Sequence, residues 1–88
     1  MIKIKEGFIL RSIAGRTVVI PNGEMLDLNL MIGLNDTGCF LWKCLEKGVE
    51  TADELKRQLM DEYKVEEAVA EKDTQRFIEN CKEHGFLV

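Results

Sequence analysis

The sequence predicts an α+β domain with a winged helix-turn-helix-like architecture, in which a three-stranded antiparallel sheet precedes three helices. Short β-branched runs fill the N-terminal third, and the remainder carries helical spacing with clear capping signals. The chain has 88 residues, of which 45% are hydrophobic and 32% charged, a composition typical of globular proteins. A chain of this length holds one hydrophobic core, so residues 1–88 are expected to form a single domain.

The three predicted strands lie in the N-terminal third. Phe8–Ile13 and Thr17–Ile20 are β-branched runs on either side of Ala14-Gly15-Arg16, a sequence that suits a hairpin turn. Pro21-Asn22-Gly23 ends the second run, because proline lacks a backbone donor and Asn-Gly favours turns. The apolar run Leu28–Leu34 is the predicted third strand. Such a sheet needs helices on one face to be stable.

Capping residues delimit the first two predicted helices. Asn35 is a suitable N-cap for the first helix, and Gly48 can end it in a left-handed conformation. Thr51 and Glu54 have the spacing of a capping box, which predicts the start of the second helix. Apolar residues recur every three or four positions in both segments, so one face of each helix is expected in the core.

The third predicted helix runs from about Glu66 to Glu83 and stops at Gly85, where Phe86 can fold back as in a Schellman motif. This segment carries six acidic and three basic residues, a sum of −3. A helix with a negative net charge is unsuited to a DNA groove, because phosphate groups line that groove. The helix-turn-helix architecture therefore does not predict DNA binding in this chain.

The overall charge excludes further classes of function. Twelve Lys and Arg residues against 16 Asp and Glu give a formal net charge of −4, which opposes binding to nucleic acid or to an anionic membrane surface. No apolar run is long enough for a membrane span or a signal peptide. Three cysteines, an odd number, are typical of reduced thiols. We expect a cytoplasmic protein without nucleic-acid or membrane partners.

Titratable side chains do not converge on a catalytic or metal site. His84, the single histidine, follows the third predicted helix, where the helix dipole favours a cation. Cys39 and Cys44 are five positions apart on one helix and point in different directions, and no Cys/His ligand spacing occurs. The sequence therefore predicts no enzyme activity, no cofactor and no metal.

The edge of the third predicted strand is a candidate binding surface. The run from Leu28 to Leu34 contains neither charge nor proline to protect its unpaired N–H and C=O groups, and Gly33 permits close approach of another backbone. An extended peptide can add to such an edge as a further strand. Two alternatives stay open, because the segment Met1–Glu6 or a second copy of the chain in a homodimer can also cover it.

A stripe on the third predicted helix lies beside its core face. Its members recur at i, i+4, i+7 and i+11, namely Val69, Asp73, Arg76 and Asn80. The stripe is either an ordinary exposed face, with an Asp73–Arg76 pair worth roughly a few tenths of a kcal/mol, or one wall of a groove with Phe77 at its edge. Spacing alone favours the exposed face.

Three segments resemble PqqD-like proteins. Leu34–Trp42 (LNDTGCFLW) resembles the L-N-x-T-G-x-x-[IL]-W segment of that family. Asp73–Ile78 (DTQRFI) and Gly85–Leu87 (GFL) resemble its D-V-x-x-F-[LI] and G-L-L segments. The spacing between the segments also fits, so the resemblance covers roughly residues 8–88.

The resemblance implies a non-catalytic domain that binds the leader of a ribosomally made precursor peptide in a cleft between the third strand and the third helix. It further implies that the domain presents this leader to a modifying enzyme, such as a radical SAM maturase. The predicted peptide-binding residues lie on those two elements: Leu30, Met31, Ile32, Gly33, Leu34, Val69, Asp73, Arg76, Phe77 and Asn80. A winged-helix DNA-binding regulator and a purely structural subunit of a maturase are the alternatives.

Overall fold

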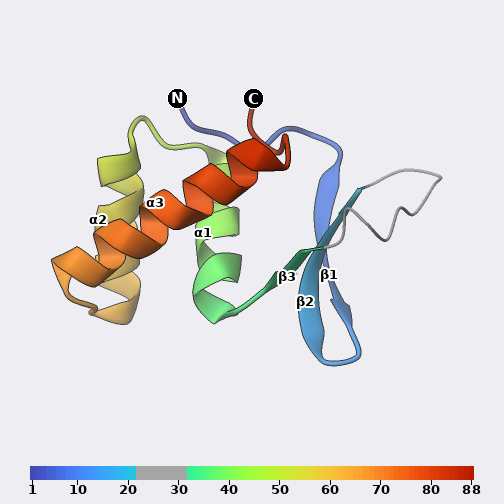
Figure 1. Cartoon of the computed structure of the whole chain (residues 1–88), viewed down its shortest axis with the longest axis horizontal. Coiled ribbons are helices and arrows are strands. Elements are labelled where there is room, and N and C mark those ends of the chain that lie inside the picture. Colours follow the sequence, from blue (N-terminus) through green and yellow to red (C-terminus); the bar gives the residue numbers. More distant parts are fainter. Residues whose placement is uncertain (22–31) are drawn as a thin grey trace.

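The computed structural model describes residues 1–21 and 32–88. Strands come first and helices follow, in the order β1 (Phe8–Ile13), β2 (Arg16–Pro21), β3 (Ile32–Leu34), α1 (Asp36–Lys47), α2 (Ala52–Tyr63) and α3 (Glu67–Glu83). The strands lie at one end of the molecule, α2 lies at the other, and α3 runs across α1 and α2 (Figure 1). This arrangement confirms the α+β class and the three predicted helices.

The predicted three-stranded sheet needs a correction. Only β1 and β2 form a long antiparallel ladder, with six residue pairs in register, so the sheet is in essence a two-stranded hairpin. β3 adds just three residues to the edge of β2, whereas a full strand over Leu28–Leu34 was expected. The strand ends at Leu34 because Asn35 already caps α1, and the predicted part at residues 28–31 lies outside the described residues.

The turn of the hairpin consists of two residues with left-handed backbone. Ala14 has a φ of 52° and Gly15 a φ of 79°, the signs that a type I′ turn requires at both central positions. This turn matches the right-handed twist of the two strands. The predicted hairpin between β1 and β2 is therefore confirmed.

The core lies where the three helices meet the inner face of the sheet. Its largest fully buried side chain, Trp42 of α1, is 1% exposed, and its ring meets the edge of Phe86 at a centroid distance of 5.4 Å. Phe86 in turn contacts Phe8 of β1 at 4.7 Å. Phe86, the third residue beyond the end of α3, thus connects the helices to the sheet.

The end of α3 has the hydrogen bonds of a Schellman motif. The N–H of Phe86 donates to the carbonyl of Cys81 at 2.9 Å, and the N–H of Gly85 donates to that of Lys82 at 3.1 Å. Gly85 has a φ of 70°, which glycine adopts without steric cost. The predicted helix end is confirmed, and it directs Phe86 back into the core.

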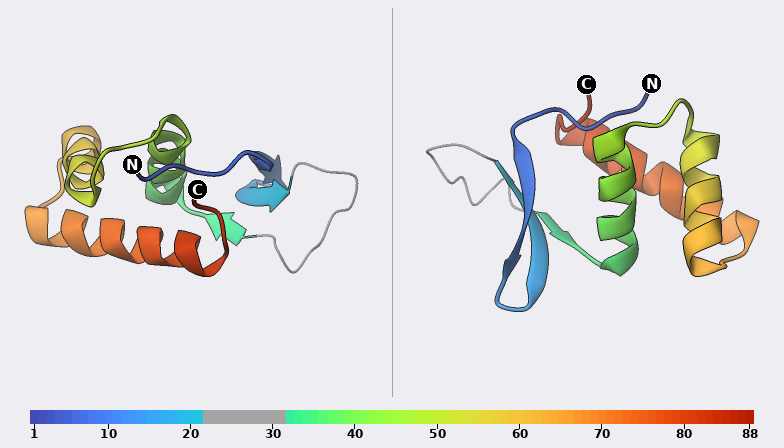
Figure 2. Two further views of the ribbon diagram at one scale, coloured as in Figure 1. Left: turned by 90° about the horizontal axis from the view of Figure 1, so that it is seen from above. Right: turned by 180° about the vertical axis from the view of Figure 1, so that it is seen from behind.

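Both ends of the chain are fixed to the helical part of the molecule. Ile2 forms an antiparallel bridge with Val49, and Ile4 forms one with Leu87. The right-hand view of Figure 2 shows the two termini near the end of α3 and away from β3. The alternative in which the segment Met1–Glu6 covers the edge of β3 is therefore wrong.

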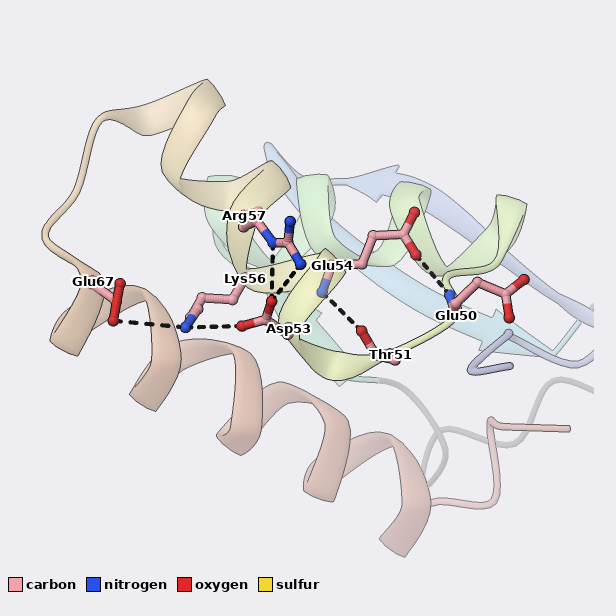
Figure 3. A network of polar contacts seen from close by, with 7 residues as sticks. All are labelled: Glu50, Thr51, Asp53, Glu54, Lys56, Arg57 and Glu67. Carbon is pink, nitrogen blue, oxygen red and sulfur yellow. Dashed lines mark hydrogen bonds and ion pairs between the residues drawn. The ribbon is translucent and has the colours of Figure 1, made fainter.

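Polar contacts at the start of α2 connect it to α3 (Figure 3). Thr51 is the N-cap, as predicted, and its hydroxyl accepts a hydrogen bond from the N–H of Glu54 at 3.2 Å. The ammonium of Lys56 lies 3.1 Å from Asp53 and 3.9 Å from Glu67 of α3. The hydrogen bond from Lys56, with another from the Arg57 side chain, holds the pKa of Asp53 below its ordinary value.

No helix within residues 1–21 and 32–88 combines the length and apolar character needed to cross a membrane. In the same part of the chain, no cluster of three or more His, Cys, Asp or Glu side chains has the proximity needed to hold a metal ion.

Candidate functional site

An open groove of about 400 Å³ lies between β3, the first turns of α1 and the middle of α3. It brings together residues that are about 40 positions apart in the sequence. The lining residues are Leu34, Asn35, Thr37, Gly38, Leu41, Asp73, Arg76, Phe77 and Asn80. Five of them, Leu34 and the four from α3, belong to the predicted peptide-binding set.

The start of α1 forms the floor and one corner of this groove. The Asn35 side-chain oxygen accepts hydrogen bonds from the N–H of Gly38 at 2.8 Å and from the Thr37 hydroxyl at 3.1 Å. A Cβ atom on Gly38 would lie 3.1 Å from that oxygen and 3.4 Å from the side chain of Leu34. Only glycine gives this corner its full width, so the cap and the groove depend on the same short segment.

Sequence reasoning assigned this corner to helix capping and to the core, and missed it as part of a site. Asn35, Thr37, Gly38 and Leu41 line the groove together with Leu34. All five lie in the segment that resembles the L-N-x-T-G-x-x-[IL]-W motif. That motif was the signal that could have placed them at the site.

The middle of α3 forms the opposite wall. Phe77 and Asp73 are half-buried, whereas Arg76 and Asn80 are exposed. Thr74, on the adjacent face of the helix, is fully buried against the core. The helix therefore presents one aromatic ring and three polar side chains to the groove.

The two charged residues of this wall do not pair with each other. Asp73 and Arg76 have the i,i+3 spacing that permits an ion pair. Among residues 1–21 and 32–88, the ion pairs involve Lys56 and Arg57 with acidic residues of α2 and α3, and neither Asp73 nor Arg76 takes part. The Asp73–Arg76 pair considered from the sequence is thus absent in the described structure.

The register of the hairpin determines which backbone groups of β2 face β3. In a two-residue hairpin the pair beside the turn, Ile13 and Arg16, is hydrogen-bonded, and such pairs alternate along the ladder. By this alternation Thr17 and Val19 direct their N–H and C=O groups away from β1, toward β3. They face Leu34 and Ile32 of β3 in the register.

Gly33 supplies the polar groups of the outer edge of β3. It faces Val18, whose N–H and C=O point to β1, so Gly33 directs its own N–H and C=O away from β2. In the described residues, no other backbone segment pairs with this outer edge. One donor and one acceptor therefore point outward from β3, next to the groove residue Leu34, with no backbone partner among residues 1–21 and 32–88.

The remaining predicted site residues lie elsewhere or outside the described part. Val69 of α3 is 46% exposed and does not line the groove. Leu30 and Met31 lie outside the described residues, and Ile32 belongs to β3, where it pairs with β2. The groove thus includes Leu34, the last residue of the predicted strand edge, and the last three of the four residues of the predicted stripe.

The reactive side chains lie apart from the groove. Burial raises the pKa of the Cys81 thiol to about 12 and also raises that of Cys44. His84 caps the end of α3, where its Nδ1 lies 2.7 Å from the carbonyl oxygen of Asn80 and its ring stacks on Phe86. None of these three side chains lines the groove.

Comparisons with known proteins give a family and a fold. The sequence model of the family described as Coenzyme PQQ synthesis protein D (PqqD) matches residues 23–87. The structure of TbiB1 in complex with the TbiA(beta) leader peptide has a TM-score of 0.71 at 22% identity, covering 97% of this chain and 93% of that chain. Lasso peptide synthetase B1 complexed with the leader peptide has a TM-score of 0.70 at 22% identity, covering 99% and 96%. No curated protein matches the sequence.

Proposed function

Because the chain belongs to the coenzyme PQQ synthesis protein D (PqqD) family, we propose that it is a non-catalytic peptide chaperone. It binds the leader of a ribosomally made precursor peptide and presents that peptide to a modifying enzyme such as a radical SAM maturase. The observation that carries the proposal is the groove between Leu34 of β3 and the middle of α3, together with the outward N–H and C=O of Gly33, the residue before Leu34. Two proteins of the same fold are known in complex with leader peptides, which supports a peptide as the ligand.

The proposed binding mode is β-strand addition. An extended leader segment pairs with the outer edge of β3 through the N–H and C=O of Gly33, which point away from β2. Main-chain hydrogen bonds supply affinity with little demand on sequence, while alternate side chains of the leader meet the groove and select the partner. Leu34, Leu41 and Phe77 offer apolar contacts there, and the polar side chains of α3 line the opposite wall.

The proposed benefit to the modifying enzyme is a raised local concentration of substrate. When the leader is held on the domain and the domain is held on the enzyme, the core of the precursor peptide reacts as a tethered group. Short flexible connections give effective concentrations of roughly millimolar. No chemical step by this domain is needed for that role.

The experiment that tests this proposal removes one backbone donor from each edge of the sheet. The probe is a synthetic peptide with the leader sequence of the precursor encoded beside the gene of this chain. Gly33→Pro deletes the outward N–H of β3. Ser12→Pro deletes the outward N–H of β1, because Ser12 pairs with Thr17 one position beyond the pair at the turn. Calorimetric titration then measures the two affinities.

We expect Gly33→Pro to weaken leader binding by about tenfold or more, the loss that follows from one hydrogen bond and a clash at the edge. Ser12→Pro is expected to bind as the unmodified chain does. Circular dichroism checks that both variants are folded. A folded Gly33→Pro variant with unchanged affinity would contradict strand addition to β3. A domain that binds the maturase but never the free leader would instead have the purely structural role.

A further inference from the structure

Two charged side chains of the α3 wall, Asp73 and Arg76, bear on which leader sequences the groove accepts. We infer, resting on the proposed function, that the groove selects an extended segment with the pattern basic-x-acidic. The basic side chain faces Asp73, the acidic side chain faces Arg76, and the residue between them points to the other side of the strand.

The carboxylate of Asp73 and the guanidinium of Arg76 can each meet a ligand group of opposite charge in the groove. Asp53 and Lys56 have the same i,i+3 spacing as Asp73 and Arg76, and they approach to 3.1 Å. In the described part of the chain, Asp73 and Arg76 form no such pair, although both line the groove. A strand inserted in the groove excludes water from these side chains, which strengthens charge-assisted hydrogen bonds to ligand groups of opposite sign. A ligand that leaves either charge unmatched incurs a desolvation cost.

The spacing of the two charges fits alternate residues of a strand. Three residues of helix correspond to a rise of about 4.5 Å, and two residues of strand to about 6.6 Å. The long side chains of Arg76 and of a ligand lysine or glutamate absorb the difference of about 2 Å between these two repeats. Directly adjacent ligand residues would not serve, because they point to opposite faces of the strand.

The direction of the chain gives the order of the charges. A strand added to β3 in the antiparallel sense, the more common pairing, runs opposite to β3. All three views of Figures 1 and 2 show β3 and α3 running in opposite directions. The added strand therefore runs parallel to α3 and meets Asp73 before Arg76, so its basic residue precedes its acidic residue.

A selection from a displayed library of random twelve-residue peptides tests the pattern directly. The unmodified chain is compared with a charge-swapped variant, Asp73→Arg together with Arg76→Asp, which preserves the net charge. Lys72→Glu is the matched control, because Lys72 is an exposed base of α3 that does not line the groove. We expect the unmodified chain and the control to enrich basic-x-acidic peptides several-fold, and the swapped variant to enrich acidic-x-basic peptides.

Enrichment without a charge pattern, or of acidic-x-basic peptides by the unmodified chain, would overturn the inference. Counter-selection on Gly33→Pro separates this failure from failure of the proposed function. Peptides that require Gly33 but lack the charge pattern would leave strand addition intact and contradict only the inferred selectivity. Peptides that bind Gly33→Pro as well as the unmodified chain would contradict the proposed binding site itself.

Discussion

At the scale of single residues, the proposed strand addition depends on Gly33. Its position in the register gives β3 an outward donor and acceptor beside the groove. Its lack of a side chain also lets a second backbone approach closely. A neighbouring glycine, Gly38, widens the corner where a Cβ would lie 3.1 Å from the Asn35 oxygen. Gly38 thus shapes one corner of the groove, and Gly33 provides the outward main-chain groups of β3.

The buried thiol of Cys81 predicts a specific loss of stability at high pH. Its pKa is raised by burial from an ordinary 9.0 to about 12. Between these values the unfolded chain has lost a proton that the folded chain retains, so the free energy of unfolding falls as the pH rises from about 9 to about 12. Urea denaturation of the unmodified chain and of Cys81→Ala measures this loss. The slope against pH is expected to be steeper in the unmodified chain, and equal slopes would contradict a buried, protonated thiol.

At the scale of elements, the β1–β2 turn contains a conformational strain that substitution can relieve. Ala14 has a φ of 52°, a left-handed conformation that costs a residue with a Cβ about 1 to 2 kcal/mol. Asparagine tolerates this conformation and is preferred before glycine in type I′ turns. Ala14→Asn is therefore expected to raise the free energy of unfolding by up to about 1 kcal/mol. Ala14→Val, with a branched Cβ, should lower it. Equal stability of the two variants in urea would contradict the assigned turn.

The helix boundaries could be predicted from the sequence, whereas the extent of the third strand could not. The helices were predicted from Asn35, Thr51 and Gly85, and the structure confirms each as a helix boundary. Local signals suffice there, because a cap is satisfied by residues within one turn. The extent of the third strand could not be predicted in the same way. An apolar run does not specify where pairing with β2 stops, and the described part of β3 is three residues long.

The candidate site, too, was predicted only where local signals suffice. The stripe of α3 follows from helical periodicity, and its residues Asp73, Arg76 and Asn80 do line the groove. Val69 has the right spacing, but it is 46% exposed and does not line the groove. Which residues stand opposite α3 depends on how α1 crosses it. That long-range packing is not encoded in any single segment.

At the scale of the whole molecule, the net charge favours a peptide over a nucleic acid as the ligand. The net charge is −4, and α3 carries five acidic and three basic residues. Phosphate groups would be repelled from both. The same acidic helix is compatible with a neutral peptide backbone, whose affinity comes from hydrogen bonds rather than from net charge.

The backbone amide of Gly33 tests the central claim most directly. Nuclear magnetic resonance of the isotope-labelled chain, titrated with the leader peptide, measures the chemical shift of this amide and its hydrogen exchange with water. Strand addition predicts that the Gly33 amide shifts and becomes protected from exchange at saturation, together with shifts along the groove-facing side of α3. The outward amide of Ser12 on the opposite edge should keep its free exchange rate. A Gly33 amide that neither shifts nor becomes protected at saturating peptide would contradict the account.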